Sequence, residues 1–375
     1  MLFIWQVMKN LGNDINYETS KYWAVVLRVT REEMPIGKTG LDIPASYVAM
    51  IAGLAVAETW LGNFPASRHH RAAMLALVAA RGGFATFGPM AQRSLKWCEF
   101  YPCASLALAP QLPRLRPPSP HSPQLPPFVR AATDAAHRRT AALLPVDRAP
   151  PPLSAVFYRL HVVVGEWRTE RPSFTGVLDE LEHVVLVELA GMRGRVRMPP
   201  EEEGDVVTAG GGADDDDDVG LGSAAAVAAA APMDVVYAGL LQAAQMCVFG
   251  TMPFTRKEAP MYGAFVQVLR GVLDSRGDGD VVGVWTAVAS AQSLLWVLFM
   301  GWSTAAQLKG DAQGAVENAR WFIRHFAAVV AVLGIRDLEG LAGVMAEFPW
   351  SRETYSALLG VLWDICLHSD EINVT

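Results

Sequence analysis

The chain has 375 residues, of which 51% are hydrophobic and 18% are charged, whereas a typical soluble domain has roughly 25% charged residues. Its formal net charge of −7 excludes a protein that binds nucleic acid through an overall positive charge. A chain of this length and apolar content can form two ordinary domains or one large helical domain. The four cysteines are too few and too scattered for a disulfide framework, and the N-terminus lacks the basic region and cleavage site of a signal peptide. We therefore expect a reducing compartment, the cytoplasm or the nucleus.

Helical spacing of the apolar residues predicts three helices in the N-terminal third, over 42–63, 65–81 and 85–101. Asp42 is placed to cap the first of them, and Pro44 suits its first turn, where no backbone N–H is needed. Gly82 and Gly83 can adopt the left-handed conformation that ends the second helix. The short connection between the first two helices predicts an antiparallel helical hairpin.

Two low-complexity segments interrupt the helical pattern. The stretch 110–152 holds twelve of the 24 prolines and favours polyproline II, so it is interpreted as a flexible surface insertion or as a ligand for a proline-reading module. The stretch 199–231 contains five consecutive aspartates, which repel one another and lack the alternate spacing of a calcium loop. The predicted layout is a single domain with disordered insertions over about 109–150 and 199–231 and ordered parts over about 1–108, 151–198 and 232–375.

The second half of the chain also has a helical pattern. Apolar spacing predicts helices over 153–191, with a break at Pro172, and then over 233–249, 261–273, 319–333 and 337–347. Ser351 is placed to cap the last helix, and Trp350 and Tyr355 have the spacing of a hydrophobic staple around that cap. No run of alternating apolar and polar residues indicates a strand, so we predict an all-α fold built of antiparallel helical hairpins.

The run 281–308, VVGVWTAVASAQSLLWVLFMGWSTAAQL, is the longest stretch without a charged residue, and protein or lipid must shield it from water. As a membrane segment it would span with 281–301, and 233–253 is a candidate second span. As a core helix it would pack against the next long helix and the last one. The flanks favour the core helix, because they carry no cluster of Lys or Arg to fix an orientation. Gln292 and Ser293 also lie in the middle of the run, where lipid would leave them without partners.

No recognisable catalytic motif is present, and we predict no catalytic, cofactor-binding or metal-binding residue and no enzymatic activity. Adjacent helical residues point about 100° apart, so His69 and His70 are predicted to be surface and boundary residues rather than co-ligands of a metal. His325 is predicted to lie on a helix surface, and Asp364 to be a buried or boundary acid paired with a basic neighbour. Five tryptophans are predicted to anchor the core: Trp296, Trp302, Trp321, Trp350 and Trp363.

Two sets of motifs resemble one known family. The segments AETWLGN and HRAAMLALVAARGG, at 57–63 and 70–83, resemble the region of fungal zinc binuclear cluster transcription regulators in which a His-led helix ends in Arg-Gly-Gly. Four further motifs resemble the C-terminal end of the same family's regulatory domain: LLWVLFMG at 294–301, RWF at 320–322, FPW at 348–350 and LWD at 362–364. The motifs follow the family's order along most of the chain, with the two low-complexity segments as insertions. The resemblance implies an all-helical regulatory domain.

The chain departs from that family in its DNA-binding part. Family members usually carry six cysteines that bind two zinc ions, followed by a basic linker and a coiled coil, whereas the four cysteines here lack that spacing and no basic run is present. No residue is therefore assigned to DNA, and no direct DNA binding is expected. The resemblance implies a non-enzymatic, transcription-regulator-like protein that binds a small effector or other transcription regulators, in the nucleus or the cytoplasm. The alternative is an integral membrane protein.

Overall fold

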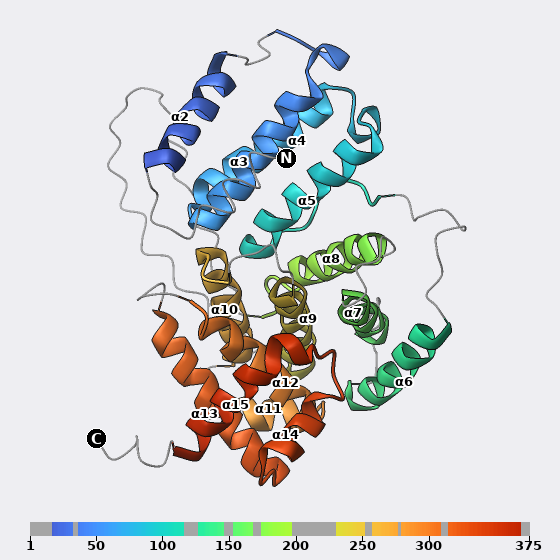
Figure 1. Ribbon diagram of the computed structural model, residues 1–375, viewed down its shortest axis with the longest axis vertical. Helices are drawn as coiled ribbons and strands as arrows, with labels where there is room; N and C mark the ends of the chain where they lie inside the picture. Colours follow the sequence, from blue (N-terminus) through green and yellow to red (C-terminus); the bar gives the residue numbers. More distant parts are fainter. Residues whose placement is uncertain are drawn as a thin grey trace, which may run out of the picture.

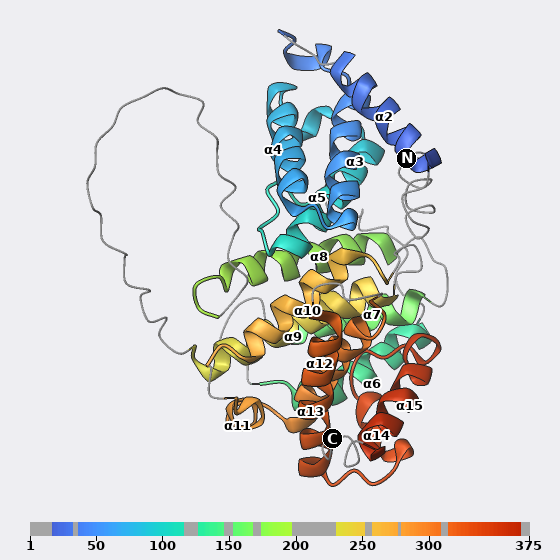
Figure 2. The same cartoon turned by 90° about the vertical axis from the view of Figure 1, so that its left-hand side faces the viewer.

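The computed structural model describes residues 17–32, 37–115, 127–145, 153–167, 174–196, 230–251, 257–276, 279–308 and 314–368. Within these ranges the regular elements are helices, and the only β-type contact is an isolated bridge between Arg193 and Val196. The predicted all-α fold is therefore confirmed. Figures 1 and 2 show the N-terminal helices at one end of the long axis, the C-terminal helices at the other end, and helices from the middle of the chain between them.

The N-terminal group consists of α2 (Tyr17–Glu32), α3 (Ala45–Leu61), α4 (Phe64–Ala80) and α5 (Pro89–Leu106). The predicted hairpin is formed by α3 and α4, because Gly62 takes a left-handed φ of 78° and Asn63 accepts a hydrogen bond from the Ala66 N–H at 3.4 Å. The start of α3 differs from the prediction. Asp42 lies in a separate 3₁₀ turn, and Pro44, in an extended conformation, is the residue that precedes the helix.

Three helices follow: α6 (Pro127–Leu143), α7 (Leu153–Trp167) and α8 (Phe174–Gly191). The disorder predicted over 109–150 is wrong for 109–115 and 127–145, because the structure describes both segments and the second contains α6. The prolines dominated the composition of that stretch, whereas FVRAATDAAHRRTAAL at 128–143 is rich in alanine and arginine, which are strong helix formers. Three parts of the predicted insertions lie outside the described residues: 116–126, 146–150 and 199–229.

Two apolar helices, α9 (Pro232–Thr251) and α10 (Pro260–Leu273), lie at the centre of the fold. Gly239 of α9 allows close packing, because a Cβ there would lie only 2.9 Å from the ring of Trp285. Of the helices in the described residues, α9 alone is long and apolar enough to cross a membrane, and 83% of its most apolar window is buried inside the protein. An interior helix of a large fold meets the same criteria, so α9 by itself does not identify a membrane protein.

The uncharged run 281–308 is not one helix, so the prediction of a continuous core helix is wrong. It divides into α11 (Val281–Thr286) and α12 (Ala291–Ala305), because Ser290 caps α12 by accepting a hydrogen bond from the Ser293 N–H at 3.2 Å. Ser293 Oγ in turn accepts a hydrogen bond from Trp285 Nε1 at 2.9 Å. The mild polar residues of the run therefore satisfy the donors at this break. With 15 residues, α12 is shorter than the roughly 20 residues that span a bilayer.

The C-terminal helices α13 (Ala315–Leu333), α14 (Leu338–Met345) and α15 (Arg352–His368) pack against α12. The predicted packing of the central run against 319–333 and the last helix is confirmed for α12. Gly301 leaves room for the ring of Phe322 on α13, with which a Cβ would collide. On the side of α15, the ring centroids of Phe299 and Tyr355 lie 5.7 Å apart.

The start of α15 agrees with the prediction. Ser351 accepts a hydrogen bond from the Thr354 N–H at 3.4 Å, and the rings of Trp350 and Tyr355 lie 5.3 Å apart on either side of this cap. This is the arrangement of a hydrophobic staple, in which the residue before the cap packs against the fourth residue of the helix. The staple fixes the angle at which the chain enters α15.

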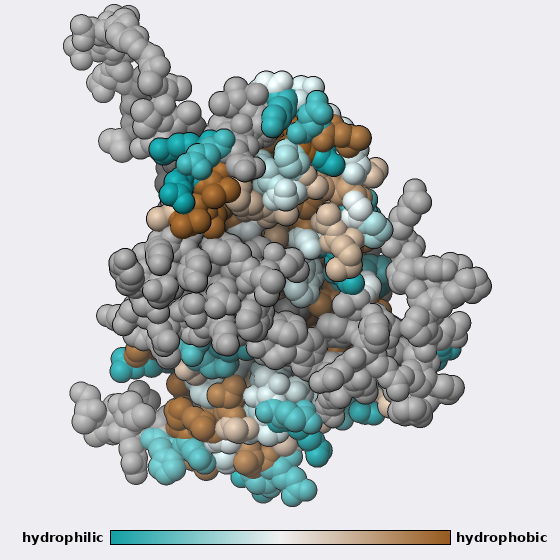
Figure 3. All heavy atoms as spheres, turned by 45° about the horizontal axis from the view of Figure 1, so that its top comes forward, coloured by the Kyte–Doolittle hydropathy of each residue, from teal (hydrophilic) through white to brown (hydrophobic). Residues whose placement is uncertain are grey.

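The surface carries apolar residues in small groups. Among the coloured atoms of the face in Figure 3, hydrophobic residues lie in separate clusters bordered by hydrophilic ones. The exposed large hydrophobic residues of the described part come from elements spread from α2 to α15: Val25, Leu41, Met90, Val316, Val332, Leu338, Val361 and Leu367. Single exposed apolar residues of this kind are normal for a folded domain.

Candidate functional site

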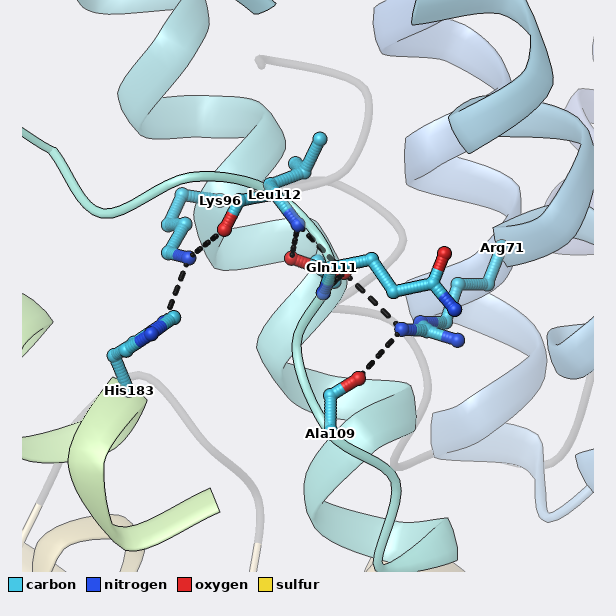
Figure 4. A network of polar contacts seen from close by, with 7 residues as sticks. Arg71, Lys96, Ala109, Gln111, Leu112 and His183 are labelled. Atoms are coloured by element: carbon cyan, nitrogen blue, oxygen red, sulfur yellow. Dashed lines mark hydrogen bonds and ion pairs between the residues drawn. The ribbon is translucent and has the colours of Figure 1, made fainter. Parts of the chain in front are cut away.

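A buried polar network joins α4, α5 and the segment that follows α5 (Figure 4). Glu99 of α5 is fully buried, and its carboxylate accepts a hydrogen bond from Arg71 Nη2 of α4 at 3.1 Å. The same carboxylate accepts hydrogen bonds from the N–H groups of Gln111 at 2.5 Å and Leu112 at 3.0 Å. Arg71 Nη2 also donates to the Ala109 carbonyl at 2.9 Å. The two buried charges thus neutralise each other, and of their buried side-chain atoms only the Nε of Arg71 has no hydrogen-bond partner among the described residues.

Lys96 extends this network to α8. It is 1% exposed, its ammonium donates to the Leu112 carbonyl at 2.6 Å, and its Nζ lies 2.8 Å from Nδ1 of His183. Burial lowers the pKa of Lys96 to about 8, although the negative charge of Glu99 opposes this shift. Burial, and then the positive charge of Lys96, lowers the pKa of His183 to about 4. The neutral imidazole of His183 therefore accepts a hydrogen bond from the ammonium.

The network holds the backbone of residues 109–112 and offers no site for chemistry. A general acid or base must come within hydrogen-bond reach of a substrate proton. The carboxylate of Glu99 is instead enclosed and occupied by the Arg71 guanidinium and two backbone N–H groups. We interpret the arrangement as a clasp that fixes the chain where it leaves α5 and that couples α4, α5 and α8.

The interface between α5 and α8 contains further buried charges. Arg93 Nη2 of α5 lies 3.5 Å from Asp179 Oδ2 of α8, while Asp179 Oδ1 and Glu182 Oε2 have no hydrogen-bond partner among the described residues. Burial, assisted by the negative charge of Asp179, raises the pKa of Glu182 well above its usual range and so favours its protonated form. In the described ranges no three His, Cys, Asp or Glu side chains lie close enough together to hold a metal ion.

A second polar cluster encloses a cavity of about 10 Å³, which is room for about one water molecule. Lys257, Tyr262 and Tyr355 line it, and the ammonium of Lys257 donates to the Phe249 carbonyl near the end of α9 at 2.5 Å. Burial lowers the pKa of Lys257 to about 7. A cation at the C-terminal end of a helix complements the helix dipole, so Lys257 caps α9. The cavity is too small for a substrate.

An open groove of about 460 Å³ lies between α6, the start of α12 and α14, and its volume is in the range of small-molecule sites, roughly 300–1,000 Å³. Its lining comes from all three helices: Arg139 and Leu143 from α6, Gln292 from α12, and Gly340, Gly343, Val344 and Glu347 from α14 and the residues after it. The Cβ position of Gly343 faces open space, because a Cβ there would meet nothing within 4 Å. The groove, unlike the cavity at Lys257, is large enough for a small ligand.

Three contacts fix the walls of this groove. Ser290 Oγ donates to the Leu143 carbonyl at 2.8 Å and so joins the end of α6 to the start of α12. Thr140 Oγ1 donates to the Glu347 carbonyl, and Arg139 Nε lies 3.0 Å from Glu347 Oε2. These bonds join α6 to the end of α14, so the groove is formed before any ligand arrives.

The five predicted core tryptophans lie away from the groove and the cavity. Trp296, Trp302, Trp321 and Trp363 are buried, and Trp350 is half-buried. None of them is among the residues that line the groove or the Lys257 cavity. Their role in the described structure is packing, and the residues that could bind a ligand are different ones.

Two predictions for single residues are wrong, and one pair is confirmed. His325 is buried rather than on the surface, because it lies one helical turn after Trp321, and their rings lie 4.1 Å apart. Asp364 is exposed, because it points about 100° away from its buried neighbour Trp363 on α15. It also has no ion pair among the described residues. His69 is exposed and His70 is half-buried, as predicted.

The groove was missed because α6, which supplies one wall, was predicted to be disordered. The signal was present in the Ala-rich and Arg-rich composition of 128–143, which follows Pro127 at a first helical position. The hydrogen bond between Thr140 and Glu347 joins α6 to the end of α14 across 207 positions of the chain, and helical periodicity does not reveal such pairs. The ion pair of Arg139 and Glu347 in the groove is therefore seen only in the folded structure.

Comparisons with protein-family models, with curated proteins and with solved structures found no match for the chain. The resemblance to fungal zinc cluster regulators therefore depends only on the motifs described above. In the structure these motifs lie at helix ends and in the core: Gly62 and Asn63 form the α3–α4 hairpin, and the rings of Trp296 and Phe348 stack at 5.7 Å. These contacts are packing contacts, and Arg71 of the second motif belongs to the buried ion pair with Glu99.

Proposed function

We propose that this protein is a non-enzymatic, transcription-regulator-like domain that binds a small effector in the groove between α6, α12 and α14. The observation that carries the proposal is the groove itself, with a volume of about 460 Å³ and walls that hydrogen bonds already hold together. A ligand that contacts α6 and α14 at once favours the arrangement in which these distant segments meet. An effector shifts a conformational equilibrium by binding one conformation of a protein more tightly than another.

The placement of the titratable groups supports binding rather than catalysis. Lys96, His183 and Glu182 have shifted pKa values, but all three are buried inside the fold. Lys96 is bonded to the Leu112 carbonyl and to His183, so it is not available to a substrate. Lys257 faces a cavity that has room for about one water. The groove itself presents one arginine and one glutamate that neutralise each other, which is an arrangement for recognition rather than proton transfer.

The link to transcription, and to the nucleus or cytoplasm, comes from the resemblance of the motifs at 57–83 and 294–364 to the family's regulatory domain. The net charge of −7 supports a protein that acts through an effector or through other regulators rather than through direct contact with DNA phosphates. We therefore propose other transcription regulators as its protein partners.

An integral membrane protein is the competing proposal, because α9 is long and apolar enough to span a bilayer. The burial of α9 inside the fold and the division of 281–308 into two short helices support the regulator instead. After a carbonate wash of cell membranes, we expect the wild-type chain in the supernatant. Retention in the membrane pellet would overturn the regulator proposal.

The direct test is a reporter assay in a fungal host, with the full chain fused to a heterologous DNA-binding domain. We expect reporter output that differs several-fold from that of the DNA-binding domain alone and that changes between rich and minimal media. Immunoblotting and proteolytic resistance of the purified fusion establish that it is present and folded. Output equal to that of the DNA-binding domain alone in every medium, from such a folded fusion, would contradict the proposal.

A further inference from the structure

The groove contains one cationic and one anionic side chain, each with unused bonding atoms. Arg139 uses Nε for the ion pair with Glu347 and Nη1 for the Ala135 carbonyl at 3.3 Å. Its Nη2 and the second carboxylate oxygen of Glu347 have no partner among the described residues. The two side chains are 51% and 36% exposed, so a ligand in the groove can reach both of them.

The rest of the lining is apolar or uncharged. Leu143 of α6 and Val344 of α14 offer aliphatic surface, and the amide of Gln292 offers one donor group and one acceptor. Gly343 leaves open space above α14, because a Cβ there would meet nothing within 4 Å. The groove thus combines two opposite charges with an aliphatic wall.

We propose that the groove binds a small aliphatic zwitterion of the α-amino acid class. The carboxylate of the ligand pairs with Arg139, its ammonium pairs with Glu347, and its side chain packs against Leu143 and Val344. This inference rests on the proposed effector role of the same groove.

Electrostatics favour a zwitterion over a ligand with a single charge. Arg139 and Glu347 lie 3.0 Å apart, so a lone carboxylate that approaches the arginine is also repelled by the glutamate. A lone ammonium meets the same conflict with the signs reversed. A zwitterion satisfies both side chains at once, and the exposed pair contributes little stability that binding would have to replace.

The test uses the full chain and isothermal titration calorimetry with three probes that share one alkyl chain. L-norleucine carries both charges, hexanoate lacks the ammonium, and pentylamine lacks the carboxylate. We expect L-norleucine to bind with a Kd below about 1 mM and each singly charged probe to bind at least about tenfold more weakly. The inference is overturned if L-norleucine does not bind at millimolar concentration, or if either singly charged probe binds as tightly.

A matched pair of glycine variants places the binding in the groove. Gly343 and Gly360 are both helical, and a Cβ at either position meets nothing within 4 Å, but only Gly343 lines the groove. Both substitutions by leucine remove a helical glycine, so both should preserve folding. We expect Gly343→Leu to abolish norleucine binding and Gly360→Leu to leave it unchanged. Equal binding by both variants would overturn the assignment.

Charge variants test the two contacts separately. In Glu347→Gln we expect the preference for L-norleucine over hexanoate to fall by about tenfold, and in Arg139→Gln the preference over pentylamine to fall by a similar factor. A weaker affinity for all three probes with unchanged preferences between them would contradict the assigned contacts.

The outcome of the reporter assay is independent of these titrations, because that assay contains no added probe. If the reporter responds to the medium but the protein does not bind norleucine, the zwitterion inference is overturned and the regulator proposal stands. Norleucine binding in a protein whose fusion never changes reporter output would support the site and contradict the regulator proposal.

Discussion

Replacement of Trp296 by alanine measures how strongly the centre of the fold is held together. Trp296 is fully buried, and its ring centroid lies 5.4 Å from that of Phe157 and 5.7 Å from that of Phe348. Its Nε1 also donates to the Pro349 carbonyl at 3.3 Å. Truncation of such a side chain loses apolar burial and leaves a cavity, which costs about 3–5 kcal/mol. The carbonyl that loses its donor places the expected cost toward the upper end of that range.

Urea denaturation followed by far-ultraviolet circular dichroism gives the free energy of unfolding directly. A loss of about 4 kcal/mol is a large part of the roughly 5–15 kcal/mol that stabilises an ordinary protein. Two substitutions serve as controls. Trp296→Phe keeps most of the buried ring and should lower the free energy of unfolding by about 1–2 kcal/mol. Val361→Ala, at a site that is 52% exposed, should change it by less than about 0.5 kcal/mol. A cost for Trp296→Ala no larger than that of Val361→Ala would refute the account of the core.

Three further predictions follow from the same structure. Gly301→Ala should destabilise the fold by about 1–3 kcal/mol in urea denaturation, because the added Cβ collides with the Phe322 ring on α13. Its control is Gly360→Ala, which should be neutral or stabilising because the Cβ there meets nothing within 4 Å. Equal effects of the two substitutions on the free energy of unfolding would contradict the packing of α12 on α13. Burial raises the pKa of Glu182 above the ordinary value of 4.5, so the stability that depends on its proton is complete at about pH 4 and is lost as the pH rises toward the folded-state pKa. Glu182→Gln should therefore be more stable than the wild type near pH 8 and no more stable near pH 4, and a gain of the same size at both pH values would show that another cause operates. Glu99→Ala should lower the free energy of unfolding by about 3–5 kcal/mol, because it removes the carboxylate that the buried Arg71 guanidinium and two backbone N–H groups bond to. It should also make 109–115 an early site of proteolysis. Equal resistance of that segment to protease in the variant and the wild type would argue against the clasp.

Much of the helical fold was predictable from the sequence, because amphipathic spacing and end signals are local properties. The hairpin of α3 and α4 and the start of α15 depend on residues within three positions of one another, such as Gly62 and Asn63, or Ser351 and Thr354. The prediction was wrong where a strong local signal masked a weaker one. The many prolines of 110–152 led to a prediction of disorder over α6, although its composition favours a helix. The uncharged run 281–308 led to a prediction of one continuous helix, although Ser290 caps a new helix within it.

The groove was not predictable, because its chemistry arises from residues distant in the chain. Neither Arg139 nor Glu347 is part of a motif, and their 3.0 Å contact depends on the docking of α6 against the end of α14. The buried network around Glu99 was hidden for the same reason, since Arg71, Lys96 and His183 each look like ordinary helix-surface residues in the sequence. Tertiary contacts of this kind are not visible in the periodicity of one sequence.

The claim that an effector in the groove controls this protein is tested most directly by the reporter assay on three fusions: the wild type, Gly343→Leu and Gly360→Leu. Both glycines have open space at the Cβ position, so the two variants differ in whether the new side chain fills the groove. We expect the wild type and Gly360→Leu to respond alike to a change between rich and minimal media, and Gly343→Leu not to respond. The same medium response in all three folded fusions would contradict it.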